Sequence, residues 1–152
     1  NSKFDSRHPS LAIGGDGVLH AVWRAPSKAN GPAQMYYSNM SSGKWSAPIV
    51  AAPSKNYQFF PNICVDDSGK VYAVWMETKS KSDFPKEKPV TGKIYISYLE
   101  NDGKFSAPKE VSYSGESFYP NMPLSMSGMN FVPVLYSSNA KLGQIMLGKA
   151  YK

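Results

Sequence analysis

Several aromatic and charged side chains have the chemistry to bind a sugar. Aromatic rings can stack on the face of a sugar ring, and Arg, His and Glu can form hydrogen bonds with its polar groups. The candidates for such a binding site are Arg7, His8, Arg24, Tyr57, Phe60, Glu77 and Tyr119. For Phe60 and Tyr119, packing between structural repeats is the competing interpretation, because each directly precedes a proline in a repeated segment.

Carboxylates that could hydrolyse a glycosidic bond are also present. Glycosidases hold two carboxyl groups about 5 to 9.5 Å apart. The candidate carboxylates are Asp5, Glu77, Asp83, Glu87 and Glu116. The sequence does not pair any two of them at such a separation, so no catalytic residue is assigned and a non-catalytic role is favoured.

We expect no metal ion and no cofactor. His8 and His20 have no Cys or carboxylate companions at the spacing of metal ligands, and both are predicted to lie at the surface or in turns. The segments "DDSG" and "NDG" resemble fragments of calcium-binding loops without the full spacing, and they predict turns. Cys64 is the only cysteine and lies in an apolar stretch, which favours a buried structural thiol.

The charge of the chain does not indicate a nucleic-acid reader. The net charge is +6, but only Arg7 and Arg24 are arginines and the lysines are spread along predicted turns and loops. Nucleic-acid readers usually cluster their basic residues and use arginine for bidentate contacts. The longest apolar runs are too short for a membrane span. The chain opens at Asn1 without a signal peptide, and we expect a secreted or periplasmic protein, or an excised segment of a longer one.

Three internal repeats organise the chain into one domain, residues 1–152. They span about 8–52, 60–112 and 119–152, and their prolines Pro9, Pro61 and Pro120 are equivalent. Trp23 matches Trp75, with Leu135 or Tyr136 in the third copy. The segment "WSAP" of the first copy matches "FSAP" of the second. A repeat of roughly 50 residues is typical of stacked architectures in which neighbouring units bury each other's faces.

Each full repeat predicts four short antiparallel strands, and the third copy lacks an obvious fourth strand. Glycine-containing turns separate the first strand from the second and the third from the fourth. The aromatic pairs before the repeated prolines are predicted to lie in the connections between repeats. The expected strands are Leu11–Gly14, Ile63–Asp66 and Leu124–Met126, then Val18–Trp23, Val71–Trp75 and Phe131–Tyr136, then Gln34–Ser38, Lys93–Leu99 and Gln144–Gly148, with fourth strands from Trp45 and Phe105. The fold class is therefore all-β, with no convincing helix.

The repeats resemble those of the sialidase-like β-propellers, which carry BNR or Asp-box repeats. The resemblance rests on "PNICVDDSGKVYAVW" followed by "KIYISYLENDGKFSAPKEVS", and it extends over nearly the whole chain. The Asp-boxes are degenerate, since "SNMSSGKW" has Met40 at the acidic position. The resemblance implies blades of a propeller, here half of the six usual in the family. "RHP" at Arg7 also resembles the family's arginine motif, but two arginines cannot build its three-arginine site.

The resemblance also implies where a ligand and partners would bind. The long connections 24–33, 77–92 and 137–143 would share one loop face with the connections between repeats. Three blades leave open faces, which a second copy completing a six-bladed propeller, or the missing blades of a longer chain, would cover. The expected function is a non-catalytic module that binds a glycan or other ligand on this loop face. The alternatives are a protein-interaction or structural scaffold and, less favoured, a glycoside hydrolase.

Overall fold

The structure, a computed structural model, is built from antiparallel β-sheets. It describes residues 5–79, 92–112, 117–123, 131–138 and 144–151, and these residues contain no helix. The strands are β1 (Arg7–Ile13), β2 (Leu19–Pro26), β3 (Ala33–Ser41), β4 (Lys44–Trp45), β5 (Ile49–Val50), β6 (Tyr57–Val65), β7 (Val71–Thr78), β8 (Lys93–Tyr98), β9 (Lys109–Glu110), β10 (Ser117–Asn121), β11 (Phe131–Ser138) and β12 (Gln144–Tyr151). The prediction of an all-β chain is confirmed.

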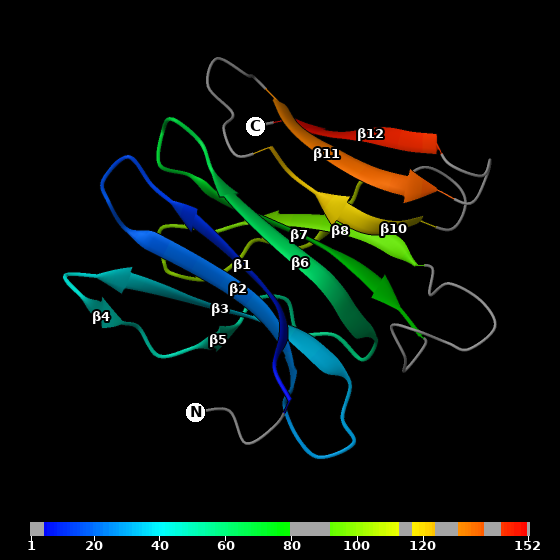
Figure 1. Ribbon diagram of the computed structural model, residues 1–152, viewed down its shortest axis with the longest axis horizontal. Helices are drawn as coiled ribbons and strands as arrows, with labels where there is room; N and C mark the ends of the chain where they lie inside the picture. Colours follow the sequence, from blue (N-terminus) through cyan, green and yellow to red (C-terminus); the bar gives the residue numbers. More distant parts are fainter. Residues whose placement is uncertain (1–4, 80–91, 113–116, 124–130, 139–143, 152) are drawn as a thin grey trace.

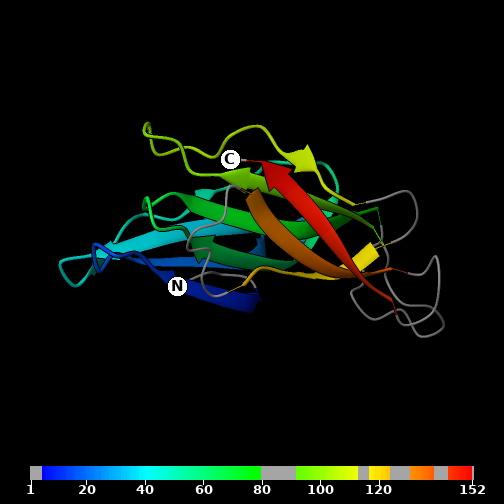
Figure 2. The ribbon, with the colours of Figure 1, turned by 90° about the horizontal axis from the view of Figure 1, so that it is seen from above.

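The twelve strands form three sheets, and each sheet is made from a separate stretch of the chain. The first sheet has the order β1-β2-β3-β4, with β5 also paired to β3. The second has the order β6-β7-β8-β9, and the third has the order β10-β11-β12. Figure 1 shows the three sheets in succession, with the second sheet between the other two. In Figure 2 the strands β11 and β12 run obliquely across those of the second sheet.

Two predicted strand limits are wrong. The aromatic pairs Phe59-Phe60 and Phe118-Tyr119 lie within β6 and β10, not in the connections between repeats. The first strand of each repeat was expected to begin after the proline, but proline is tolerated at a sheet edge or beside a bulge, and both conditions hold here. The fourth strand of the first repeat is split into β4 and β5. The strand predicted at 124–126 lies outside the described residues, as does most of the connection 77–92.

The sheets pack through faces that the two-residue alternation of strands defines. One face of each sheet carries Trp23, Trp75 or Tyr136, and we call it the tryptophan face. The opposite face carries Val22, Val74 or Leu135, and we call it the valine face. Leu135 pairs with Asn121 as Val74 pairs with Asn62, so Tyr136 is the equivalent of the two tryptophans.

The second sheet is buried on both faces. Its tryptophan face packs on the valine face of the first sheet, in a core that includes Val22, Met35, Ala73 and Trp75. Its valine face packs on the tryptophan face of the third sheet, in a second core that includes Val74, Ile96, Val134 and Tyr136. Burial of a large apolar side chain stabilises the fold by roughly 1.5–3 kcal/mol. These two cores therefore hold the three sheets together.

The predicted glycine turns are confirmed where the structure describes them. Gly17 and Gly69 have φ of 78° and 81° in the turns before β2 and β7, and Gly43 and Gly103 have φ of 76° and 80° in the later turns. A residue with a Cβ rarely adopts this conformation. In the "DDSG" turn, Asp66 Oδ1 accepts hydrogen bonds from three donors of the turn itself. The aspartate therefore caps a turn, as the sequence predicted.

Paired serines explain why "WSAP" and "FSAP" repeat. Ser38 Oγ donates a hydrogen bond to the carbonyl oxygen of Ser46 at 2.8 Å, and the two hydroxyl oxygens lie 3.1 Å apart. In the second sheet Ser97 and Ser106 form the same pair, with distances of 2.6 and 3.0 Å. Each pair ties the third strand of its sheet to the segment after the turn. The turn is thus braced by the paired serines.

The prediction that His20 lies at the surface is wrong. The side chain is buried in the first sheet, and its Nδ1 lies 2.8 Å from the hydroxyl oxygen of Tyr37. Tyr37 lies in β3, where it pairs with Val22 of β2. The contact of His20 with Tyr37 therefore forms only when β3 pairs with β2. Burial lowers the pKa of His20 below its ordinary value of 6.5, and Asp16 opposes this shift.

We expect acid to weaken the fold through His20. Since the folded pKa is lower than the unfolded one, the unfolded chain binds the proton more readily. The contribution of this histidine is fully present above pH 6.5 and is lost as the pH falls through the lowered pKa. Urea unfolding of the protein and of a His20→Gln variant, at roughly pH 8 and pH 5, measures this contribution. An identical pH dependence in both proteins would contradict it.

Candidate functional site

Three β-bulges lie at equivalent positions of the three sheets. The register shifts between Arg7 and Ser10 in β1, between Phe59 and Asn62 in β6, and between Phe118 and Asn121 in β10. Bulges re-aim side chains and are common beside binding sites. Each bulge contains the residue before the repeated proline.

The residue before the proline has a positive φ in all three bulges. The angle is 52° at His8, 51° at Phe60 and 53° at Tyr119. This conformation costs of order 1–3 kcal/mol for a residue other than glycine, and such strain tends to gather at functional sites. The same strained position in three sheets indicates that these side chains are held in a specific direction.

The three bulged side chains form a continuous column of rings. The ring of His8 lies 4.7 Å from that of Phe60, and the ring of Phe60 lies 4.6 Å from that of Tyr119, measured between centroids. These distances are within the range of favourable ring contacts. Tyr119 at one end is 49% exposed, so the column opens to solvent there. We refer to His8, Phe60 and Tyr119 as the ring column.

Both arginines lie beside the ring column. Arg7 and Arg24 are direct cross-strand partners between β1 and β2. The exposed Nε of Arg7 lies 2.6 Å from Asp5 Oδ2. Arg24 lies over the ring of Phe59, with its guanidinium carbon 4.2 Å from the ring centroid. Like charges placed directly opposite each other destabilise a sheet, and the Asp5 carboxylate beside Arg7 offsets this repulsion.

Tyr57 adds another aromatic ring near the ring column, in β6. Its ring is stacked near that of Phe59, with centroids 6.5 Å apart and planes at 19°. Phe59 is fully buried and also contacts Phe60 at 6.0 Å. Tyr57 is half-buried and packs against the second core. Six of the seven predicted ligand-binding residues therefore lie in the ring column or close to it. Tyr57 is linked to the column through Phe59, which contacts Phe60.

Glu77, the seventh, is placed in a polar network between the first two sheets. Its Oε1 accepts hydrogen bonds from Ser54 Oγ at 2.7 Å and from Asn56 Nδ2 at 2.9 Å. Its Oε2 lies 3.4 Å from Gln58 Nε2. These contacts hold the segment between β5 and β6 against β7. The geometry favours a structural role for Glu77, and the sequence offered no sign of this network.

The structure describes two of the five candidate carboxylates, Asp5 and Glu77. Asp5 pairs with Arg7, and Glu77 lies in the polar network. Asp83, Glu87 and Glu116 lie outside the described residues. Among the residues that the structure describes, no three His, Cys, Asp or Glu side chains are close enough together to hold a metal ion. Cys64 is buried, and its Sγ lies 3.5 Å from the sulfur of Met122 in the second core.

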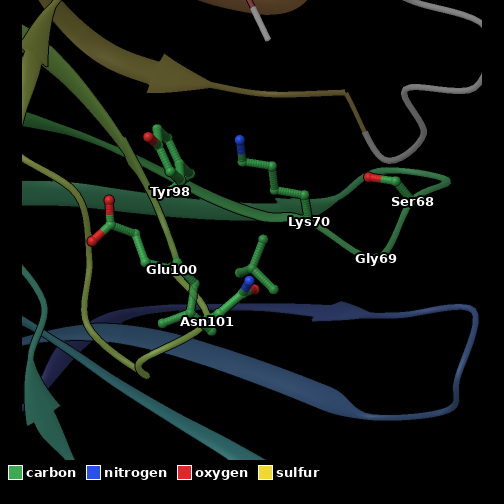
Figure 3. A pocket seen from close by; sticks show the side chains of 8 residues that line it. Ser68, Gly69, Lys70, Tyr98, Glu100 and Asn101 are labelled. Carbon is green, nitrogen blue, oxygen red and sulfur yellow. The ribbon is translucent and has the colours of Figure 1, made fainter.

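A hollow lies at the end of the second sheet that is opposite the ring column, where the chain turns after β6 and β8. It has a volume of about 530 Å³ and lies between the turns after β6 and β8. Figure 3 shows Lys70, Tyr98 and Glu100 lining it. Lys70 Nζ lies 3.8 Å from the centroid of the Tyr98 ring. Burial and the nearby Asp66 raise the pKa of Tyr72, which lies beside this hollow, to about 12. The sequence reasoning missed this hollow, because it assigned both turns a purely structural role.

No protein-family model and no curated protein matches this chain. Among the described segments, no helix is long and apolar enough to cross a membrane. The site is therefore interpreted from its own geometry.

Proposed function

We propose that the chain is a module of a sialidase-like β-propeller that binds an acidic carbohydrate without cleaving it. In this proposal the three sheets are propeller blades, and the ligand binds at the ring column and the two arginines. The ring column carries the proposal, because three separate sheets direct strained bulges to one place. A scaffold that only packed its sheets together would not need the same strain in each of them.

The chemistry of this cluster suits a carboxylated or sulfated glycan. The exposed ring of Tyr119 offers a flat apolar surface for a sugar face. Arg7 supplies donors in a planar fork that matches a carboxylate or sulfate group. Its exposed side chain is held 2.6 Å from Asp5, which fixes its direction. The net charge of +6 would also attract an acidic ligand from a distance.

We expect Tyr119→Ala to weaken glycan binding by about fivefold, since one ring contact contributes on the order of 1 kcal/mol. A glycan array identifies the ligand, and calorimetry on the best acidic glycan measures the change. The matched control is Tyr98→Ala, which removes a partly exposed tyrosine, 37% exposed, at the turn end. Equal affinity of both variants and the parent would contradict the proposed site.

Two further results would overturn the proposal. Release of a fluorophore from a sialoside by the protein would contradict the absence of catalysis. A protein that bound no glycan on the array would favour the second candidate, a protein-interaction scaffold. That candidate rests on a separate observation, the exposed tryptophan face of the first sheet.

A further inference from the structure

The two junctions between sheets are built in the same way. In each, the tryptophan face of the later sheet covers the valine face of the earlier one. Val22 and Val74, at the centres of two valine faces, are completely buried. On the opposing faces, Trp75 is completely buried and Tyr136 is 2% exposed. One type of interface therefore joins the first sheet to the second and the second to the third.

A repeated hydrogen bond accompanies each junction. The backbone N–H of Ile63 lies 3.3 Å from Ser10 Oγ of the preceding sheet. The N–H of Met122 donates to Asn62 Oδ1 of the preceding sheet at 3.1 Å. Ser10, Asn62 and Asn121 are equivalent, since each pairs with the central residue of its valine face. If a further sheet packed on the third sheet in the same way, the N–H at its equivalent of Ile63 would donate to Asn121 Oδ1. In the first sheet, the equivalent of Ile63 is Leu11.

At each outer face of the stack, a central apolar position that the junctions bury is exposed. On the tryptophan face of the first sheet, Leu11 is 58% exposed, whereas its equivalent Ile63 is 5% exposed. On the valine face of the third sheet, Leu135 is 44% exposed. The tryptophan face also carries a groove of about 360 Å³ lined by Leu11, Trp23, Trp45 and neighbouring residues. Exposed apolar patches of this kind mark interaction surfaces.

The exposed tryptophan face is also uncharged. Alternation along the strands places twelve described side chains on it, and none of them is Lys, Arg, His, Asp or Glu. They are Leu11, Ile13, Leu19, Ala21, Trp23, Ala25, Gln34, Tyr36, Ser38, Met40, Trp45 and Val50. In a chain of net charge +6, a whole sheet face without lysine would not repel a second copy.

We propose that the tryptophan face of the first sheet binds the valine face of the third sheet of a second copy. The chain carries both halves of the junction, so a second copy supplies the partner for each open face. Two such contacts, related by a two-fold axis, close a particle of six sheets. Across each contact, the N–H of Leu11 would donate to Asn121 Oδ1 of the other copy. This inference does not depend on any ligand at the ring column.

The mass in solution tests the proposal. Light scattering should give twice the 16.7 kDa of one chain. Leu11→Asp and Leu135→Asp each place a charge at the centre of one face, and each should give a folded protein of 16.7 kDa, as circular dichroism would verify. Asn101→Asp adds the same charge at an exposed turn and should leave the double mass unchanged.

Mixing the two monomeric variants tests which faces meet. The Leu135→Asp copy keeps its tryptophan face, and the Leu11→Asp copy keeps its valine face, so the mixture should regain particles of double mass through one intact contact. Failure to do so would overturn the contact between unlike faces. A parent protein of single mass would also overturn the proposal and would leave a further sheet of a longer polypeptide as the occupant. A double mass that survives both substitutions would overturn the assigned faces.

Discussion

Trp75→Ala is expected to lower the free energy of unfolding by about 3–5 kcal/mol. The Trp75 side chain is fully buried between the first two sheets, where it is stacked near Tyr95 with ring centroids 6.1 Å apart. Its removal leaves a large cavity in a core that both sheets share, and the core can collapse only partly. Chemical denaturation followed by circular dichroism measures the loss.

Trp23 provides a matched control for this substitution. It occupies the equivalent position of the first sheet, where it is similarly stacked near Tyr36 at 6.0 Å. It is only half-buried and lines the open groove, so Trp23→Ala should cost about 1 kcal/mol. Both changes should be compared in the Leu135→Asp background, in which the proposed contact between copies is absent. Equal losses there would contradict the open position of Trp23.

The two tryptophans also mark how far the sequence could predict the fold. The repeats and the alternation of apolar residues were sufficient to predict an all-β chain with most of its strands and turns. They made Trp23 and Trp75 equivalent, and the local structure around both is alike. The two differ in their surroundings, because the first sheet covers Trp75, whereas Trp23 lines an open groove. A pattern within the repeats contains no information about what lies beyond them.

The ring column was predicted only in part. The sequence placed His8, Phe60 and Tyr119 before repeated prolines and proposed them as ligand-binding residues. It treated each proline as the limit of a strand and therefore missed the bulges that direct the three rings together. The positive φ of these residues arises from the bulged sheet edge, and no local propensity of phenylalanine or tyrosine indicates it.

The polar network was not predicted, because most of its contacts join residues about 20 positions apart. Gln58 is 1% exposed and lies between the first two sheets. Its Oε1 accepts a hydrogen bond from the N–H of Met35 at 2.6 Å, and its Nε2 donates to the carbonyl oxygen of Ala52 at 2.6 Å. Glutamine usually lies at the surface, so its position in β6 gave no indication of burial.

Gln58→Leu is expected to lower the free energy of unfolding by about 2–4 kcal/mol. Leucine is of similar size but leaves the buried N–H of Met35 and the carbonyl oxygen of Ala52 without their side-chain partner. An unsatisfied buried polar group costs roughly 1–3 kcal/mol. Asn56→Ala is the graded control, because it removes a single bond to Glu77 Oε1, which keeps its bond from Ser54. This control should cost about 1 kcal/mol.

Amide hydrogen exchange provides a local test of the same substitution. In the parent protein the amide of Met35 should exchange slowly, because Gln58 Oε1 holds it within the first core. Gln58→Leu should accelerate exchange at this amide more than at the neighbouring amides that bond along β2 and β3. Unchanged protection of Met35 would show that the bond from Gln58 does not hold the two sheets together. If stability also fell, the loss would then come from altered packing alone.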